Sequence, residues 1–215
     1  MNKMTLSQIG VEGPNDPYHF QKELNRITIE GSEDYRLVLF FIKKGARMPL
    51  HDHPNMSVFF RMMFGKLNYR SYDKIDDKFK YNQFSMDEYQ ELLSEKKRIA
   101  ARLVNKTILS GPQFLMVRPS RNNLHEFVAE ENTCFFDICL PNYTADSLRR
   151  ITYFKEITDF GEVNSKTLVD NTHQMSGLSQ MENIKFIEYE ATPPKLPVNF
   201  EVADLPYIGE MKWIR

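Results

Sequence analysis

Two histidines separated by one residue are the most chemically distinctive feature of the chain. His51 and His53 lie in the run PLHDHP, which has the pattern of a strand end. Side chains two residues apart on a strand point to the same face, so both imidazoles can reach one point while Asp52 faces away. Neutral imidazole binds iron, zinc, copper and nickel, and the pair therefore predicts a metal site. A surface pair with no ligand role is the alternative that this spacing leaves open.

A third ligand has few candidates, because the chain has only five histidines. His125 lies in a strand-like run just before a second apolar run, and we expect it to complete the site. His19 falls in a predicted helix and His173 in a polar segment, and both are expected at the surface. Three neutral imidazoles would leave the charge of a divalent ion uncompensated, which suits an anionic thiolate as a further ligand.

The elements that must position these histidines are predicted to be short strands. Apolar runs separated by Gly, Pro and Asn predict strands at Tyr35–Lys44, Arg47–His53, Ser57–Met63, Lys66–Tyr72, Ile99–Ile108, Gln113–Val117, Leu124–Val128 and Thr133–Leu140. A short helix is predicted over residues 17–26, and a surface helix or lid over residues 86–97. Many short strands with regular turn signals indicate an all-β fold, an antiparallel sandwich or barrel of the jelly-roll type.

The 215 residues fit one domain with a sizeable core. We expect an N-terminal lead-in over residues 1–34 and a barrel core over residues 35–160. A polar loop is expected over residues 161–184, and an edge strand with an extended wrap over residues 185–215, which is rich in proline. Nothing in the sequence indicates a coiled coil or another assembly seam, so a monomer is expected.

Composition excludes several classes of partner and compartment. The net charge of -1 gives no footprint for nucleic acid or an anionic membrane. No run approaches the roughly 20 apolar residues of a membrane span, and the N-terminus lacks the apolar centre of a signal peptide. Cys134 and Cys139 are five residues apart, so they fall on opposite faces of a strand and are not expected to bond to each other. A reduced, cytoplasmic setting fits best, with the nucleus a further possibility.

The surroundings of the histidine pair resemble the first motif of the cupins. Gly45 precedes His51 by five intervening residues, and Gly65 follows His53 at the matching distance. The glutamate of that motif is replaced by Val58, which removes a carboxylate ligand and requires another histidine. The fold that this resemblance implies is a cupin-type double-stranded β-helix with a few short peripheral helices.

A longer resemblance covers nearly the whole chain, from Met4 onward. The chain is similar to the cysteamine (2-aminoethanethiol) dioxygenase and plant cysteine oxidase family of cupin thiol dioxygenases. The segments that carry this similarity are Met48–Phe59, Phe64-Gly65, Ser71–Asp73, Arg121–His125, Phe136–Tyr143, Thr152–Phe154, Phe200–Val202 and Pro206–Gly209. Because Met4 already aligns near the end of the helical extension that often precedes the family's barrel, that extension is not expected here.

The resemblance implies Fe(2+) on His51, His53 and His125, with Asp137 and Tyr143 beside the site. Asp137 would orient an iron-bound histidine or the substrate amine. Tyr143 would donate a hydrogen bond to O2 or substrate, or would simply pack at the barrel rim.

Two departures from the family pattern affect these expectations. Asn55 stands where glycine is usual, and asparagine tolerates the left-handed backbone of such a turn. Ile151 stands where many members carry a cysteine, so a thioether to Tyr153 cannot form and the role of Tyr153 is left to packing or hydrogen bonding.

The implied reaction is oxidation of a thiol by O2 to a sulfinic acid, with both oxygen atoms entering the product. The substrate would be cysteamine, cysteine or the N-terminal cysteine of a protein, and in the last case the enzyme would act as an oxygen sensor. The loops at residues 73–97 and 161–182 would wall a channel for a peptide. Two other readings stay open: a cupin with another metal and chemistry, such as an isomerase or a different oxygenase, and a non-catalytic cupin that binds a ligand.

Overall fold

The computed structural model describes residues 5–146, 148–157, 183–190 and 202–207. The first sheet has the strand order β12-β1-β2-β9-β4-β7 and the second the order β10-β11-β6-β5-β8-β3. The strands of the first sheet are β1 (Leu24–Gly31), β2 (Arg36–Ile42), β4 (Ser57–Phe64), β7 (Phe114–Val117), β9 (Thr133–Leu140) and β12 (Val202–Asp204). Those of the second are β3 (Arg47–His51), β5 (Lys66–Lys74), β6 (Arg98–Ser110), β8 (Leu124–Ala129), β10 (Tyr153–Ile157) and β11 (Ile184–Glu190).

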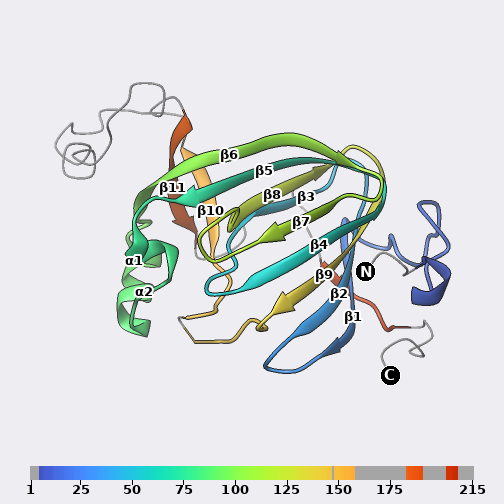
Figure 1. Cartoon of the computed structure of the whole chain (residues 1–215), viewed down its shortest axis with the longest axis horizontal. Coiled ribbons are helices and arrows are strands. Elements are labelled where there is room, and N and C mark those ends of the chain that lie inside the picture. The colour runs from blue at the N-terminus through green and yellow to red at the C-terminus, as the bar shows by residue number, and fades with distance from the viewer. Residues whose placement is uncertain (1–4, 147, 158–182, 191–201, 208–215) are drawn as a thin grey trace.

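The two sheets face each other across a common core, as Figure 1 shows. The second sheet closes on itself, because Tyr153 of β10 pairs with His51 of β3. Consecutive strands alternate between the two sheets over much of the chain, which is the arrangement of a double-stranded β-helix. The all-β, cupin-type fold expected from the sequence is confirmed.

Aromatic side chains from both sheets fill the core. Phe60 and Phe135 come from the first sheet, and Tyr69 and Phe127 from the second; all four are at most 3% exposed. The Phe60 and Phe127 rings stack with their centroids 5.4 Å apart, which joins the sheets directly. Strand β4 alternates buried and half-buried residues, as the period of two requires when one face is turned to the core.

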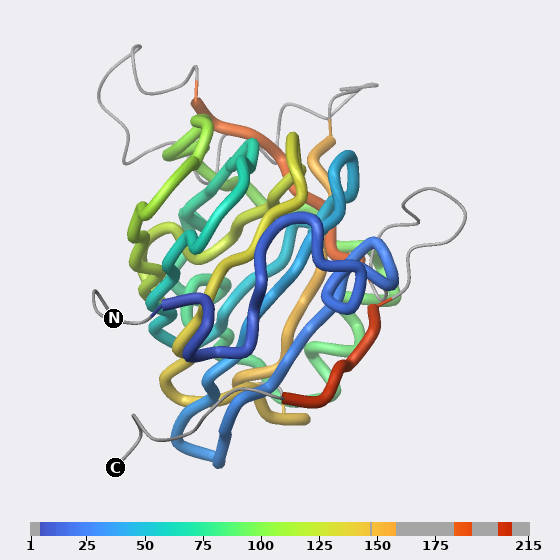
Figure 2. The backbone as a smooth tube through the Cα atoms, turned by 90° about the vertical axis from the view of Figure 1, so that its right-hand side faces the viewer, coloured from blue at the N-terminus to red at the C-terminus, as the bar shows by residue number. Residues whose placement is uncertain are grey.

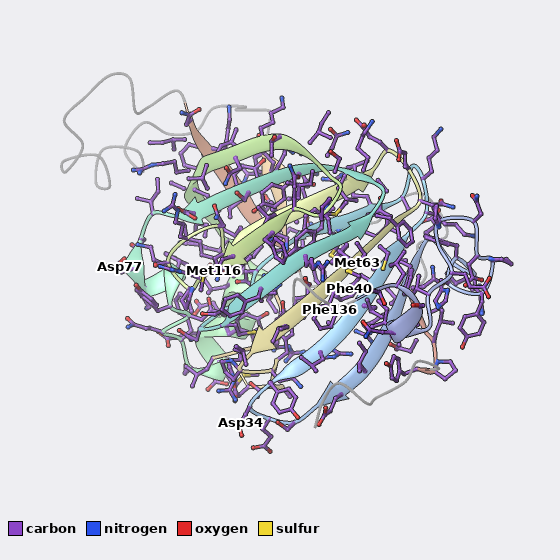
Figure 3. All side chains as sticks on the ribbon, turned by 45° about the vertical axis from the view of Figure 1, so that its right-hand side comes forward. Asp34, Phe40, Met63, Asp77, Met116 and Phe136 are labelled. Carbon is purple, nitrogen blue, oxygen red and sulfur yellow. The ribbon has the colours of Figure 1, made fainter. Side chains whose placement is uncertain are left out.

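Figure 3 contrasts packed side chains with exposed ones. Phe40 and Phe136 lie on the adjacent strands β2 and β9, among the packed side chains. By contrast, Asp34 and Asp77 project from the ends of the molecule into solvent.

The N-terminal segment does not form the helix predicted over residues 17–26. Residues 17–23 are turns, and strand β1 begins at Leu24 and pairs with β2. The side chain of Asn25 closes the last turn, accepting from the Lys22 backbone N–H at 2.9 Å and donating to the Lys22 carbonyl at 2.7 Å. Ile27 and Ile29 are buried on either side of the exposed Thr28, which is the alternation of a strand, and the segment pairs with β2.

His19 was expected at the surface, and this prediction is wrong. Its side chain is 1% exposed, its Nδ1 lies 2.5 Å from a carboxylate oxygen of Asp16, and its ring stacks on Phe41 at 4.5 Å. His19 is therefore a core residue: its ring packs on Phe41, which belongs to the hydrophobic cluster on the outer face of the first sheet.

Two short helices, α1 (Asp77–Lys80) and α2 (Met86–Ser94), lie together at one end of the barrel (Figure 1). A capping box between Ser85 and Glu88 begins α2, and Tyr89 and Leu92 bury its inner face against the barrel. The surface helix predicted over residues 86–97 is present over Met86–Ser94: most of its residues are exposed, and Tyr89 and Leu92 anchor it to the core.

The C-terminal part of the chain contributes to both sheets. β11 pairs with β10 on one side and β6 on the other, so it is an interior strand and the prediction of an edge strand there is wrong. β12 instead forms the edge of the first sheet, parallel to β1, as the red and blue segments of Figure 2 show. The polar loop and most of the wrap lie outside the described residues. None of the described helices is long and apolar enough to cross a membrane.

Candidate metal centre

The three predicted histidines meet at one point inside the molecule. Candidate ligand atoms of His51, His53 and His125 all lie within 4.8 Å of one another, and each residue is at most 6% exposed. Their ring centroids are 4.7–4.9 Å apart. His51 ends β3 and pairs directly with His125 on β8, after an irregularity in the register that begins at Met48. Three nitrogen atoms therefore lie close enough together to bind one metal ion on one side, as a facial metal site requires.

Backbone carbonyls fix the orientation of two of the rings. Nδ1 of His51 donates to the Pro49 carbonyl at 2.7 Å, and Nδ1 of His53 donates to the Asn123 carbonyl at 3.3 Å. A proton on Nδ1 leaves Nε2 with its lone pair, which is the form that binds a metal ion. Asn123 also holds the backbone of His53, accepting from its N–H at 3.2 Å and donating to its carbonyl at 2.7 Å.

Burial favours the neutral form of all three imidazoles. It lowers the pKa of His51, and it lowers the pKa of His53 and His125 well below the ordinary histidine value. The neighbouring imidazoles lower the last two further, because a second positive charge nearby would be repelled. Three neutral nitrogen donors in a buried cluster suit a divalent transition metal, so the residues present fit such an ion.

Behind the histidines lies a buried ion pair that sequence reasoning missed. Asp52 is fully buried, and one of its carboxylate oxygens accepts from Lys74 Nζ at 2.7 Å. The other accepts from the Thr152 backbone N–H at 2.9 Å, and Lys74 also donates to Asn82 at 3.3 Å. Strand alternation predicted that Asp52 faces away from the two histidines, but not what it would meet there.

A second buried acid supports the other ligand strand. Glu126 follows His125 on β8, points to the opposite face and is 2% exposed. Its carboxylate accepts from Arg47 on β3 and Arg70 on β5. An acidic residue next to each of His51 and His125 thus points away from the cluster and pairs with a cation: Asp52 with Lys74, and Glu126 with Arg47 and Arg70.

Asp137 and Tyr143 lie beside the histidines, lining one cavity of about 300 Å³ together with His51 and His53. Asp137 is 8% exposed, its Oδ1 has no hydrogen-bond partner in the described structure, and burial raises its pKa well above the ordinary aspartate value. The Tyr143 ring centroid is 5.6 Å from that of His53. Its hydroxyl donates to the Asp52 carbonyl at 3.1 Å, and burial raises its pKa well above that of a free tyrosine.

The cavity walls come mainly from the first sheet. Besides the residues above, β1 and β2 contribute Arg26 and Arg36, and β12 contributes Val202. Within the described chain, no residue of the 73–97 segment lines this cavity, so the expectation that this segment walls it is wrong. The other expected wall, residues 161–182, lies outside the described residues.

A comparison with protein families decides where the chain belongs. A family model described as PCO_ADO matches residues 2–211, nearly the full length of the sequence. The chain belongs to the PCO_ADO family. This PCO_ADO chain therefore combines a cupin fold with a buried cluster of three histidines that could hold a metal ion.

Several curated proteins resemble parts of this PCO_ADO chain. It is 30% identical over 134 residues to a 2-aminoethanethiol dioxygenase of Homo sapiens, covering 58% of this chain and 49% of the relative. It is 25% identical over 148 residues to plant cysteine oxidase 1 of Arabidopsis thaliana, covering 68% of this chain and 45% of the relative. The aligned part thus spans about half the length of each of these relatives.

Two solved structures resemble part of the PCO_ADO chain. An RmlC-like cupin from Shewanella frigidimarina matches with a TM-score of 0.38 at 15% sequence identity, covering 56% of this chain and 78% of that one. A double-stranded β-helix protein from Klebsiella pneumoniae matches with a TM-score of 0.35 at 13% identity, covering 53% of this chain and 73% of that one.

Proposed function

We propose that this protein is a non-haem iron(II) dioxygenase that converts a thiol to a sulfinic acid, R–SH + O2 giving R–SO2H. The observation that carries the proposal is the meeting of three buried, neutral imidazoles at a cavity that also exposes Asp137 and Tyr143. Membership of a family whose relatives are named for oxidation of aminoethanethiol and cysteine supports it.

His51, His53 and His125 would hold Fe(2+), which supplies the redox chemistry that O2 requires and attracts the substrate thiolate. The chain itself supplies a buried, preformed site. The rings are fixed before the ion arrives, because Pro49 and Asn123 hold two of them through backbone carbonyls. Neutral imidazoles leave the positive charge of the ion available to lower the pKa of an incoming thiol.

Asp137 would receive the substrate amine. Its carboxyl group is buried and lines the cavity, and among the described residues nothing forms a hydrogen bond with its Oδ1. A substrate ammonium placed there would satisfy the carboxyl group and favour its charged form, because an opposite charge offsets the effect of burial. Cysteamine and an N-terminal cysteine both carry an amine next to the thiol, which fits this role.

Tyr143 would act through its hydroxyl oxygen. The hydroxyl proton is engaged by the Asp52 carbonyl, so the lone pairs of the oxygen remain available to accept from a substrate N–H. The same bond joins the tyrosine to the backbone between the two histidines, which fixes its distance from the site.

The product of the reaction tests the proposal. Protein purified without oxygen and loaded with iron is mixed with cysteamine or with a peptide that begins with cysteine, then exposed to air. A mass gain of two oxygen atoms on the thiol substrate is the expected result, and 18O2 gas should label both. No gain, or a gain of one oxygen atom, overturns the proposal. Turnover with zinc in place of iron would point to another cupin chemistry.

The identity of the substrate sets the biological role. Oxidation of a Cys-initiated peptide would make the enzyme a candidate oxygen sensor acting on cytoplasmic or nuclear proteins. Oxidation of cysteamine alone would make it an enzyme of small-thiol metabolism.

A further inference from the structure

The cavity beside the histidines has a cationic wall that the proposed reaction does not use. Arg26 of β1 and Arg36 of β2 both line it, on the sheet that also carries Asp137. Their neighbours differ. Arg26 forms a two-point ion pair with Asp204 of β12, at 2.6 Å and 2.8 Å, so its charge is largely compensated.

Arg36 has no such acidic partner. It donates to the hydroxyl of Thr28, from Nη2 at 2.6 Å and from Nε at 3.3 Å, and no carboxylate of the described chain lies within ion-pair distance of it. The Thr28 contacts use one edge of the guanidinium, and within the described chain its other N–H groups make no hydrogen bond, which leaves them available to a ligand. Burial, and then the nearby charge of Arg26, lower the pKa of Arg36, and Asp204, which is paired with Arg26, offsets this only in part.

Strand register places Arg36 close to the proposed amine site. Arg36 pairs with Cys139 across β2 and β9, and Val38 pairs with Asp137. Paired residues share a face, so Arg36 and Asp137 face the same cavity about 7 Å apart along neighbouring strands. A molecule that fills the cavity of about 300 Å³ from the histidines outward meets the aspartate and the arginine together.

We propose that Arg36 is a specificity-determining residue that binds a carboxylate of the substrate. The inference rests on the proposed thiol oxidation and names its substrate class: an aminothiol that also carries a carboxylate. A guanidinium holds a carboxylate through two parallel hydrogen bonds, and in a half-buried cavity such a bond is stronger than in water. The carboxylate comes either from the α-carboxyl group of free cysteine or from an acidic side chain that follows an N-terminal cysteine. Cysteamine has neither group.

Two matched substrate pairs test the proposal. Cysteine and cysteine amide differ only in the α-carboxylate, and the amidated peptides Cys-Glu-Gly and Cys-Gln-Gly differ only in the side-chain carboxylate. Dissociation constants are measured by calorimetry on the iron-loaded protein without oxygen, and kcat/KM is measured by oxygen uptake. The native protein should prefer the acidic member of at least one pair by about 10- to 100-fold. The pair that shows the preference identifies the source of the carboxylate.

Variants then assign the preference to one residue. Arg36→Gln should reduce the preference to about twofold or less, and Arg36→Lys should restore part of it. Arg102→Gln, an arginine exposed on β6 outside the cavity, should keep the native preference. Equal binding within both pairs, or an unchanged preference in Arg36→Gln, overturns the proposal. Because binding is measured without turnover, a carboxylate preference in a protein that oxidises no thiol would overturn only the proposed reaction. Failure to bind either pair would overturn both.

Discussion

His51 and His125 are directly paired residues of antiparallel strands, and their ring centroids lie 4.8 Å apart. Because the pairing belongs to the β3–β8 ladder, the distance between these two ligands is set by the backbone of the sheet. His53 joins them from the segment that follows β3, where Asn123 holds it. The metal site is therefore built mainly by the fold, and substitutions at its ligands should affect metal content more than structure.

Replacing His125 by alanine should remove the iron. Two imidazoles cannot hold a ferrous ion as three do, so His125→Ala should purify with little iron and without thiol oxidation. Metal analysis by mass spectrometry and oxygen uptake are the measurements. His19→Ala is the matched control and should retain iron, because His19 lies in the core on the outer face of the first sheet. A His125→Ala protein with full iron content would contradict the assignment.

The same control variant should lose stability. His19→Ala removes the stack on Phe41 and the hydrogen bond to Asp16. The free energy of unfolding, from urea denaturation, should fall by about 1–3 kcal/mol. His19→Phe, which keeps the stack and loses the hydrogen bond, should lose less than the alanine variant. A larger loss in the phenylalanine variant would show that the hydrogen bond dominates.

Breaking the buried ion pair should destabilise the protein strongly. Lys74→Met leaves the Asp52 carboxylate buried with no cation at 2.7 Å, and we expect a loss of about 3–5 kcal/mol in the free energy of unfolding. The double variant Asp52→Asn with Lys74→Met should recover much of it, because no unpaired charge remains. Iron affinity should fall about 10- to 100-fold in the single variant. Additive losses in the double variant would argue against a coupled pair.

Asp137→Asn should separate stability from activity. No hydrogen bond to the Asp137 carboxyl group is present within the described chain, and burial disfavours its charged form. An amide of the same shape should therefore leave the free energy of unfolding unchanged or raise it by about 1 kcal/mol. Thiol oxidation should fall about 10- to 100-fold in the variant, because an amide cannot become negatively charged when the substrate ammonium arrives. A loss of stability with full activity would indicate a structural role.

Cys134 should be unreactive in the folded protein. Burial raises its pKa well above the ordinary thiol value of 9.0, and its side chain is 0% exposed. The folded thiol keeps its proton where the unfolded thiol loses it, so its contribution to stability is full below pH 9 and falls as pH rises above 9. Ellman's reagent at pH 8 should label no cysteine in the native protein and both after denaturation, since neither forms a disulfide. Rapid labelling of Cys134 in the native protein would contradict this burial.

Patterns that repeat locally could be predicted from the sequence, and long-range pairings could not. The two-residue spacing of His51 and His53 predicted a shared face, and the apolar runs predicted most strands within a few residues of their bounds. The prediction of a helix over residues 17–26 was wrong, because the chain from Leu24 onward pairs with β2 as a strand. Local propensity carries no information about such a partner.

The surroundings of the site show the same limit. Asp52 was expected to turn away from the histidines, but its partner Lys74 is 22 residues further on and reaches it only through the fold. Arg36 lies 101 positions before Asp137, and only the β2–β9 register brings them to one cavity. Asp137 and Tyr143 were expected beside the site only from the family resemblance, and no local pattern marked Arg36 as part of the same cavity.

The ion pair of Arg26 with Asp204 joins residues 178 positions apart, and it closes the wall that Val202 completes. The three clustered histidines, His51, His53 and His125, by contrast, lie within the first 125 residues of the chain. During synthesis the ligands therefore leave the ribosome well before the strand that finishes the cavity. We therefore expect that a metal ion could bind before β12 completes the wall of the cavity.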